Sequence, residues 1–290
     1  MADGLTGLPI AAEMLDAAHA SGLDLGAALS GDDDHLRPTE IAQPALLFVE
    51  CALRSTLPAD LDVVAVAGHS VGEYAAAVAA HALQPADAMR VVIERGRAMA
   101  AMHEGTMCAL IGIDVDAATA VCEETQRETG EIVVVANHNA PGQLVISGSV
   151  AGVDAAAKLA LARGARRAIP LNVSGAFHSP LMRSAATAFG AVLDAVSVAD
   201  PHPPVVCNVD ARDVRSAAGL RERLRAQLTS PVLWIDCVHQ LVDLGAEMLV
   251  EVGPGTVLSG LARRIAPDVR VVSVNTPDAA ARLDAAAVAG

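Results

Sequence analysis

The sequence predicts an α/β protein with a parallel-sheet core and a smaller inserted α+β subdomain of the ferredoxin-like type. An apolar run at residues 63–67 leads into Gly-His-Ser-Val-Gly-Glu at 68–73 and then into an Ala-rich helical stretch at 74–80. Strand and helix patterns alternate over most of the chain, as they do in proteins with parallel sheets. Between residues 107 and 173 the order changes to strand-helix-strand-strand-helix-strand, which is the ferredoxin-like order.

The first part of the predicted core contains helices and one strand. Residues 9–20 and 40–56 have helical apolar patterns, and the strand at 63–67 follows them. Pro85 suits the first turn of the next helix, where its missing N–H costs nothing. Apolar residues then recur at helical spacing, and Arg95 falls on the same face as Ala88, Val91, Val92 and Met99.

The predicted subdomain occupies residues 105–173 and separates two core segments, residues 1–104 and 174–290. The turn Pro141-Gly142 joins its second and third strands, and His138 lies in a predicted turn at 137–139. Its strands are expected at residues 107–113, 132–136, 143–147 and 167–173, and its helices at 117–129 and 150–162.

The last part of the chain returns to alternating elements, which favours a parallel sheet that continues on both sides of the insert. Helices are expected at residues 180–195, 220–228 and 257–265, and strands at 205–208, 248–252 and 270–274.

Composition excludes several classes of function. The 290 residues are 53% hydrophobic, enough for a large core, but only 2% aromatic, and the net charge is −14. Few rings for base stacking and a negative charge argue against nucleic-acid binding. The five cysteines are scattered without any C-x-x-C pair, which indicates reduced thiols and no zinc site. Without a secretory signal or an apolar run of membrane-spanning length, we expect a soluble, cytoplasmic monomer that binds no metal.

The segment Gly-x-Ser-x-Gly at residues 68–72 predicts a nucleophile elbow, in which a sharp strand-to-helix turn exposes the Ser70 hydroxyl. Gly68 and Gly72 are expected to leave room for the tight turn and for close backbone packing. The Val71 N–H would lie at a helix N-terminus, where it can stabilise an oxyanion. Although the pattern occurs by chance in roughly one chain in ten of this length, its strand and helix flanks favour a functional serine.

A serine nucleophile needs a base, and His178 is the best placed of the nine histidines. It lies just beyond a predicted strand, at the edge where α/β sheets build their sites, and Ser179-Pro180 follows as a helix-start signal. Without these flanking signals, a surface-loop histidine would be the better interpretation of His178, by roughly two to one. The His69 side chain, next to Ser70, is expected to point elsewhere.

Six segments carry a resemblance to a known family: Ala-Gln-Pro-Ala-Leu at 42–46, Gly-His-Ser-Val-Gly-Glu at 68–73, Arg-Gly-Arg-Ala-Met at 95–99, Asn-Ala-Pro-Gly-Gln at 139–143, Gly-Ala-Phe-His-Ser-Pro-Leu-Met at 175–182 and Glu-Val-Gly-Pro-Gly at 251–255. Together they resemble the malonyl-CoA:acyl-carrier-protein transacylases, a family that includes the acyltransferase domains of polyketide synthases. The resemblance implies a hydrolase-like α/β core with an inserted ferredoxin-like subdomain, in agreement with the pattern of elements.

The resemblance implies an S-malonyltransferase that works through a malonyl-serine intermediate. Ser70 would be the acylated nucleophile, His178 its general base, and the Gln227 backbone carbonyl the group that orients His178. The Val71 N–H would stabilise the oxyanion. Malonyl-CoA would acylate the serine, and the phosphopantetheine thiol of an acyl carrier protein would then accept the malonyl group.

Substrate selection is also implied by the resemblance. Arg95 matches the arginine that holds the free malonyl carboxylate, a task suited to a guanidinium fork. Phe177 matches the residue that leaves no room for an α-methyl group, which favours malonyl over methylmalonyl. Gln43, His69 and Asn139 fall in the matching segments and are expected to bind substrate. Without the resemblance, an arginine in a helix would be interpreted as a solvated charge.

The implied substrates are malonyl-CoA and the phosphopantetheinylated carrier protein, without a bound cofactor. Carrier proteins of such pathways are acidic and this chain carries −14, so docking would need a local basic patch. The candidates are Arg163, Arg166 and Arg167 in the subdomain, or Arg221, Arg223 and Arg225 near Gln227. Simple solvation of these arginines is an equally good interpretation.

One expected segment has no match. Family members begin with a strand and a Gly-Gln-Gly-Ser-Gln-like loop that supplies a second oxyanion amide, and residues 1–8 contain no such loop. Loss of one oxyanion donor typically costs a factor of about 10²–10³ in rate. The missing loop leaves open an impaired family member that acts as a binding protein. Independently of the loop, a serine esterase or thioesterase could use the same elbow. Arg95 and the insert argue against the esterase. The sequence leaves open whether the pathway makes fatty acids or polyketides, or decarboxylates malonate.

Overall fold

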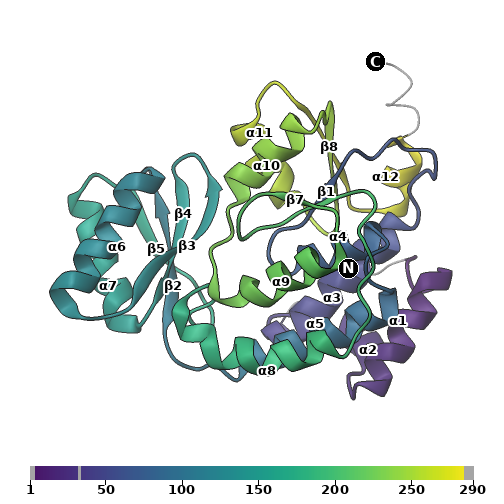
Figure 1. The fold of residues 1–290 in the computed structure, drawn as a ribbon, viewed down its shortest axis with the longest axis horizontal. Helices are drawn as coiled ribbons and strands as arrows, with labels where there is room; N and C mark the ends of the chain where they lie inside the picture. The colour runs from purple at the N-terminus through teal and green to yellow at the C-terminus, as the bar shows by residue number, and fades with distance from the viewer. Residues whose placement is uncertain (1–3, 32–33, 284–290) are drawn as a thin grey trace.

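The computed structural model describes residues 4–31 and 34–283 of the chain. It has a large α/β core and, beside it, a smaller α+β subdomain drawn in teal at the left of Figure 1. The helices of the core are α1 (Pro9–Ala20), α2 (Leu25–Ser30), α3 (Thr39–Arg54), α4 (Gly72–Ala79), α5 (Pro85–Ala100), α8 (Arg183–Asp194), α9 (Ala217–Ala226), α10 (Trp234–Asp243), α11 (Val257–Ile265) and α12 (Pro277–Ala281). Its strands are β1 (Val66–Ala67), β6 (Val205–Val206), β7 (Asp213–Val214), β8 (Met248–Val252) and β9 (Arg270–Val274), and the short 3-10 helices are η1 (Pro180–Met182) and η2 (Gln227–Thr229).

The strands of the core form two short sheets. β1 pairs in parallel with β6, and β7 extends this sheet antiparallel to β6. β8 pairs in parallel with β9 in the second sheet. A cavity of about 580 Å3 lies between the sheets, with residues 61–69 on one wall and residues 245–252 on the other. The predicted parallel core is therefore present, but in two parts.

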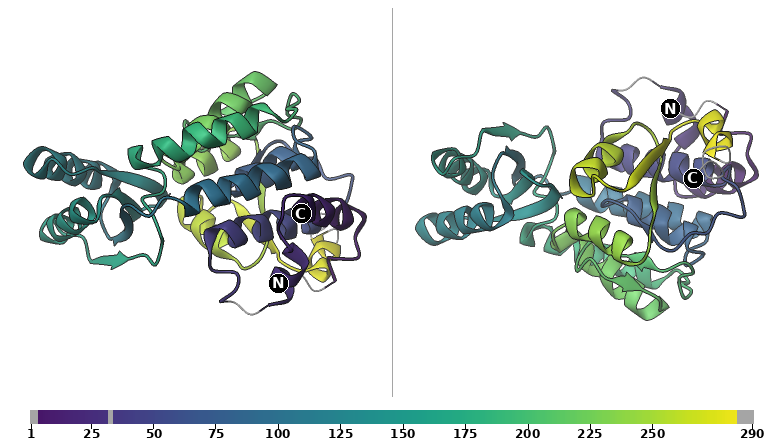
Figure 2. Two further views of the ribbon diagram at one scale, coloured as in Figure 1. Left: turned by 90° about the horizontal axis from the view of Figure 1, so that it is seen from below. Right: turned by 90° about the horizontal axis from the view of Figure 1, so that it is seen from above.

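The subdomain has the predicted ferredoxin-like architecture. Its strands β2 (Thr106–Ile111), β3 (Val133–Ala140), β4 (Gln143–Gly148) and β5 (Arg167–Pro170) form one antiparallel sheet in the order β3-β4-β2-β5. Apolar side chains of α6 (Val115–Thr129) and α7 (Val150–Ala162) pack with the sheet in a single cluster. Both helices lie side by side away from the core (Figure 2). The boundaries 105 and 173 stay predictions.

Several expected elements differ from the structure. The strands predicted at 63–67 and 205–208 each shrink to two residues, because β1 and β6 pair with each other over two positions only. Residues 137–139, predicted as a turn, continue β3 with two register shifts, because β4 remains beside them as a partner. The helix α10 was not expected: it starts without a side-chain cap, so the sequence carries no start signal. α2, β7 and α12 are too short to show periodicity.

Helix α5 packs within the core and places a charged residue, Arg95, in its interior. Its apolar face is buried as predicted, and Arg95 on the same face is only 1% exposed. α5 packs between α1, α3 and α8, whose buried residues form one apolar cluster with it. A buried arginine needs partners for its charge, and these come from the site described below.

The five cysteines are all buried and unpaired. Within the described residues, no set of three or more histidine, cysteine or acidic side chains is arranged to hold a metal ion. In the same part of the chain, none of the helices combines the length and the apolar character needed to span a bilayer.

Candidate active site

Ser70 lies on the turn between β1 and α4, with a φ of +51° in the left-handed region that non-glycine residues seldom adopt. Its N–H donates to Asn208 Oδ1 at 2.8 Å, and Asn208 Nδ2 donates to the Gly68 carbonyl at 2.8 Å. Asn208 follows β6 and is fully buried. One side chain thus fixes both ends of the turn, which has the strand-turn-helix geometry of a nucleophile elbow.

The two glycines of the turn differ in their roles. A Cβ at Gly68 would lie 2.0 Å from the Gly72 carbonyl carbon and oxygen, so only glycine fits. A Cβ at Gly72 would meet only Glu50 Oε1, at 4.0 Å. The expectation that both glycines make room for the turn is therefore right for Gly68 and wrong for Gly72, because no backbone atom outside its own helix and its chain neighbours lies within 4 Å of a Cβ placed at Gly72.

Ser70, His178 and Gln227 form a hydrogen-bonded chain. The Ser70 Oγ lies 2.8 Å from His178 Nε2, and His178 Nδ1 lies 3.0 Å from the Gln227 backbone carbonyl. Because a carbonyl only accepts, the Nδ1 atom carries the ring proton and Nε2 is left to accept the serine proton. The structure thus brings together the three residues that the sequence analysis singled out.

His178 is held in the neutral form. It is 4% exposed, and burial together with the positive charge of Arg95 lowers its pKa to about 3. Its backbone φ is +57°. The next residue fixes this conformation, since Ser179 Oγ donates to the Ala176 carbonyl at 2.6 Å and accepts the Leu181 N–H at 3.3 Å. The arrangement suits a base that accepts a proton only during reaction.

Arg95 points at the serine from helix α5. Its Nη2 donates to Ser70 Oγ at 3.0 Å and to Gln227 Oε1 at 2.8 Å, and its Nη1 donates to Gln43 Oε1. The guanidinium also lies over the Tyr74 ring, 5.6 Å from its centroid. Its Nε has no partner among the described residues. Because a guanidinium has five N–H donors and three are used in these bonds, one on Nε and one on Nη1 remain.

Sequence reasoning missed Glu73, a buried carboxylate behind the elbow. Gln227 Nε2 donates to its carboxylate and to the Ser70 carbonyl, the latter at 3.0 Å, and the Asn208 N–H donates to Glu73 Oε1 at 3.0 Å. Burial raises the pKa of Glu73 to about 7, against the lowering effects of these donors and of Arg95. Its place in the Gly-His-Ser-Val-Gly-Glu segment was the available signal.

His69 turns away from Ser70, as expected, and connects the elbow to the subdomain. Its Nε2 lies 2.9 Å from Oδ1 of Asn139 on β3, and its ring meets the Trp234 ring edge-on at 5.4 Å. Burial lowers the pKa of His69. The candidate site therefore lies where the core and the subdomain meet.

The remaining predicted site features are the Val71 N–H, the Phe177 ring and the N-terminal oxyanion segment. Val71 is the N-cap residue just before α4, and its N–H donates to no residue in the described part of the chain. Phe177 is half-buried and packs against the apolar clusters of both the core and the subdomain. The N-terminal segment expected for a second oxyanion amide falls partly on residues 1–3, outside the described residues.

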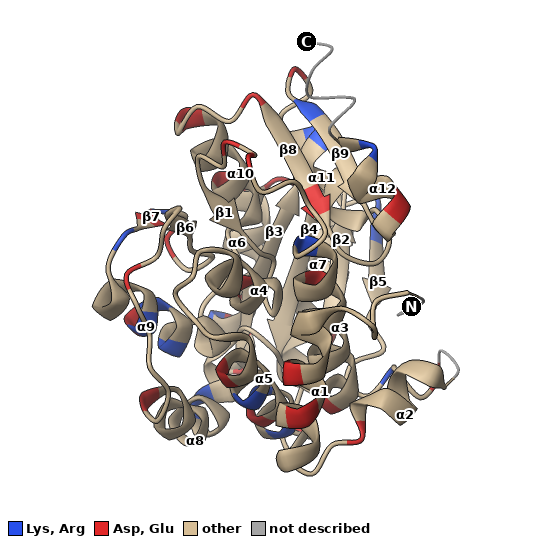
Figure 3. Cartoon of the chain, turned by 90° about the vertical axis from the view of Figure 1, so that its right-hand side faces the viewer, with Lys and Arg blue, Asp and Glu red and all other residues tan. Residues whose placement is uncertain are grey.

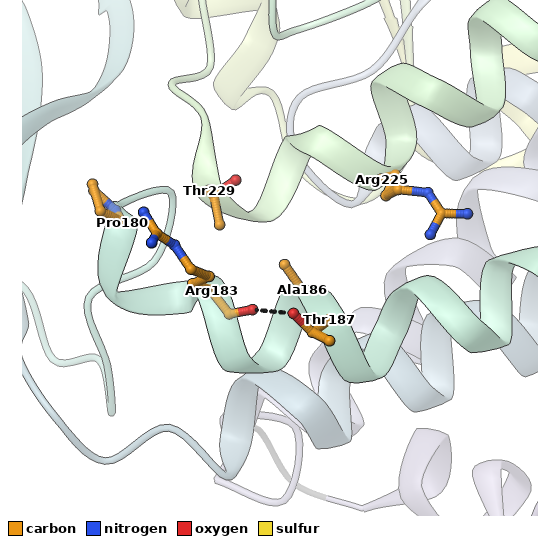
Figure 4. A pocket seen from close by; sticks show the side chains of 6 residues that line it. All are labelled: Pro180, Arg183, Ala186, Thr187, Arg225 and Thr229. Atoms are coloured by element: carbon orange, nitrogen blue, oxygen red, sulfur yellow. Dashed lines mark hydrogen bonds between the residues drawn. The ribbon is translucent and has the colours of Figure 1, made fainter.

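The predicted basic patches differ in how far their charges are already used. Near Gln227, Arg221 donates to the carbonyls of Leu193 and Val196, Arg223 binds both oxygens of Asp210, and Arg225 pairs with Asp194. Figure 3 shows such acidic and basic residues next to each other along α9. A surface groove of about 450 Å3 beside α9 is lined by Pro180, Arg183, Ala186, Thr187, Arg225 and Thr229, and Arg225 points away from Arg183 (Figure 4).

In the subdomain, Arg163 pairs with Glu124 at 2.8 Å. Arg166 and Arg167 are exposed, and their side chains form no ion pair or hydrogen bond with any described residue. They are therefore the least neutralised of the six candidate arginines.

Comparisons with known proteins agree with this geometry. Residues 11–278 match the model of the acyl transferase domain family. The chain is 42% identical over 252 residues to the malonyl CoA-acyl carrier protein transacylase of Bacillus subtilis, covering 86% of this chain and 79% of that protein. It is 40% identical over 284 residues to the Haemophilus influenzae protein of the same name, covering 95% and 90%.

Solved structures show the same fold. The acyl-carrier-protein S-malonyltransferase of Burkholderia pseudomallei superposes with a TM-score of 0.90 at 36% identity, covering 97% of this chain and 94% of that chain. A malonyl-transacylase solved in complex with its type II polyketide acyl-carrier protein superposes with a TM-score of 0.89 at 35% identity, covering 97% and 93%. With its match spanning residues 11–278, this chain belongs to the acyl transferase domain family.

Proposed function

We propose that the protein transfers a malonyl group from malonyl-CoA to the phosphopantetheine thiol of an acyl carrier protein, for fatty-acid or polyketide synthesis. One observation carries the proposal: the Ser70 hydroxyl contacts both a neutral imidazole, at 2.8 Å, and a buried guanidinium, at 3.0 Å. The first contact suits acyl transfer and the second suits an acyl group that ends in a carboxylate. The names of the relatives in Bacillus subtilis and Haemophilus influenzae support the same substrate.

In the first half-reaction, His178 Nε2 takes the Ser70 proton while Ser70 Oγ attacks the thioester carbonyl of malonyl-CoA. The resulting oxyanion is stabilised by the Val71 N–H at the start of α4. The C–S bond then breaks, the malonyl group stays on Ser70, and the proton on His178 passes to the departing CoA thiolate. The Gln227 carbonyl stabilises the transient imidazolium through Nδ1–H.

In the second half-reaction, the carrier-protein thiol attacks the malonyl-serine ester. His178 takes the thiol proton and returns it to Ser70 Oγ as the C–O bond breaks, so the enzyme is restored. Exclusion of water is required here, because water attacking the same ester would release free malonate. The buried surroundings of His178 support transfer over hydrolysis.

Selection of malonyl rests on Arg95 and Phe177. The free N–H donors of Arg95 would bind the distal carboxylate, and Gln43 and Gln227 hold the guanidinium in place by accepting from it. Phe177 lies next to His178 at the contact between core and subdomain, where it would crowd an α-methyl group. Asn139 and His69 would line the other wall of the acyl site.

The acidic carrier protein would dock on Arg166 and Arg167, whose side chains form no ion pair with any described residue. The double charge reversal Arg166→Glu/Arg167→Glu should raise the carrier-protein KM and leave acylation by malonyl-CoA unchanged. Arg223→Glu is the contrast, since it breaks an ion pair with Asp210 and should lower thermal stability instead. Equal carrier KM values in the wild type and the double variant would refute this patch.

The central test is mass spectrometry of the protein after incubation with malonyl-CoA. We expect a malonyl adduct on Ser70 that is absent in Ser70→Ala and that disappears when carrier protein is added. Rapid loss of the adduct in water alone would indicate a thioesterase. Absence of any adduct would indicate a binding protein without transferase activity.

A further inference from the structure

Behind the catalytic serine, a chain of hydrogen bonds connects Arg95 to a buried carboxylate. Arg95 Nη2 donates to Gln227 Oε1 at 2.8 Å, and Nε2 of the same amide donates to Glu73. Arg95 is 1% exposed and Glu73 is fully buried. The Gln227 side chain thus bridges a buried cation and a buried anion without direct contact between them. Such charges are rarely buried unless they are paired.

The other charged and titratable groups near Glu73 do not replace Arg95 as its counter-charge. Tyr74 is its neighbour on α4, Cys207 follows β6, and Cys237 lies on α10. Burial raises the pKa of all three, so they are neutral near pH 7. Arg95 from α5 is the single permanent cation that acts on the Glu73 carboxylate among the described residues.

Glu73 also fixes the reacting groups through its two partners. Gln227 orients His178 with its backbone carbonyl, and Asn208 holds the Ser70 N–H. Both partners donate to the Glu73 carboxylate. Glu73 touches neither the serine oxygen nor the imidazole, so it is a positioning residue that acts through Asn208 and Gln227.

We propose that Glu73 is the counter-charge of Arg95 in the free enzyme and that binding of the malonyl carboxylate to Arg95 is coupled to uptake of a proton by Glu73. This inference rests on the proposed function. When the malonyl carboxylate binds Arg95, that carboxylate and the Glu73 carboxylate behind Gln227 share one cation. The repulsion is removed if Glu73 takes up a proton, so the protonated enzyme binds malonyl-CoA more tightly.

The sign of the effect follows from linkage. Glu73 titrates near neutrality in the free enzyme, since its pKa is about 7, and the bound carboxylate raises that pKa. Below pH 7 the carboxyl is already protonated and binding needs no proton. Above pH 7 each further pH unit weakens binding by up to tenfold. If roughly 7–10 Å separate the Glu73 carboxylate from the malonyl carboxylate and the effective dielectric constant is about 20, the affinity for malonyl-CoA changes by about ten- to fiftyfold in total.

The first experiment measures KM for malonyl-CoA between pH 6.5 and 9. In the wild type KM should rise with pH, and in Glu73→Gln it should stay near the low-pH value. Acetyl-CoA, which has the same CoA phosphates but no free carboxylate, should show no rise in either protein. Glu50→Gln is the matched control, because burial also raises the pKa of Glu50, to about 8, yet no hydrogen bond joins it to Arg95 within the described structure. It should keep the wild-type profile.

A second measurement does not depend on how well the Glu73 variant folds. Titration of the Ser70→Ala protein with malonyl-CoA at pH 7.5, in two buffers of different ionisation enthalpy, counts the protons taken up. We expect net uptake with malonyl-CoA and none with acetyl-CoA. Equal uptake for both ligands, or a KM rise in Glu73→Gln as steep as in the wild type, would overturn the coupling. A missing malonyl adduct on wild-type Ser70 would instead refute the proposed function.

Discussion

Replacement of Arg95 tests the assignment of substrate most directly. Arg95→Met keeps most of the side-chain volume in the core but removes the cation beside Ser70. Arg90→Met is the matched control on the same helix, because Arg90 is half-exposed and its one ion-pair partner among the described residues is Asp87, at 2.6 Å. The two variants change the net charge equally, so any difference between them comes from the position of the charge.

The expected magnitude follows from the bonds that a malonyl carboxylate would make. Each charge-assisted hydrogen bond contributes about 1.5–3 kcal/mol, and a guanidinium fork makes two. Loss of both corresponds to about 3–6 kcal/mol, or a factor of about 10²–10⁴ in kcat/KM for malonyl-CoA. The variant also leaves the Oε1 atoms of Gln43 and Gln227 without their donor, at about 1–3 kcal/mol each, so its Tm should fall.

The assay compares CoA release from malonyl-CoA and acetyl-CoA with carrier protein in excess. In Arg95→Met the ratio of the two kcat/KM values should fall by about 10²–10⁴, while acetyl transfer persists and Arg90→Met behaves as the wild type. Use of a ratio removes any loss that comes from partial unfolding. A malonyl-to-acetyl ratio that is unchanged in Arg95→Met would show that Arg95 does not bind the malonyl carboxylate.

Three further predictions concern the elbow and the base. Gly68→Ala should abolish acylation and destabilise the fold by more than about 3 kcal/mol, because its Cβ would overlap the backbone at Gly72. Gly72→Ala should keep most of the activity. Equal effects of the two changes on the yield of the malonyl adduct would contradict this prediction. The pKa of His178 is about 3 in the folded protein and about 6.5 in the unfolded chain. Because the unfolded chain binds this proton first, the free energy of unfolding should fall as pH drops from 6.5 towards 3, by up to about 1.4 kcal/mol per pH unit. Urea titrations should show a shallower decline in His178→Gln. Ser70 has a φ of +51°, so Ser70→Gly should unfold with about 1 kcal/mol more free energy than Ser70→Ala, and identical melting curves would exclude stored strain.

Local signals account for the parts of the fold that the sequence predicted well. The helix α5 begins at Pro85 and buries the face that its apolar spacing indicated. The subdomain was recognisable because its strands have partners within the same 69-residue stretch. Only the last strand is clearly shorter than predicted, since β5 ends at Pro170 and not at residue 173. Strands β1 and β6 are separated by more than a hundred residues, and their pairing over two positions depends on that distant contact. No local pattern specifies it.

In the candidate site, too, the residues with a local sequence signature could be predicted, and those that depend on distant contacts could not. Ser70 and His178 were accessible because each lies at a chain feature with its own signature, a glycine turn or a strand end followed by a helix start. Asn208 had no such signature, and Glu73 had only its place in the Gly-His-Ser-Val-Gly-Glu segment, which does not show that the carboxylate is buried. Their roles depend on partners from α4, η2 and the segment after β6 that meet only in the folded chain.

The side chain of Trp234 gives the protein an optical probe of its own. It is the one tryptophan in the sequence, it is 5% exposed, and it lines the cavity between the two sheets. Its ring meets His69, the residue that joins the elbow to Asn139 in the subdomain. Tryptophan fluorescence, excited selectively over Tyr74, therefore comes from one place, at the junction of core and subdomain. A change in this fluorescence on addition of malonyl-CoA is therefore expected to report events at the elbow without a label.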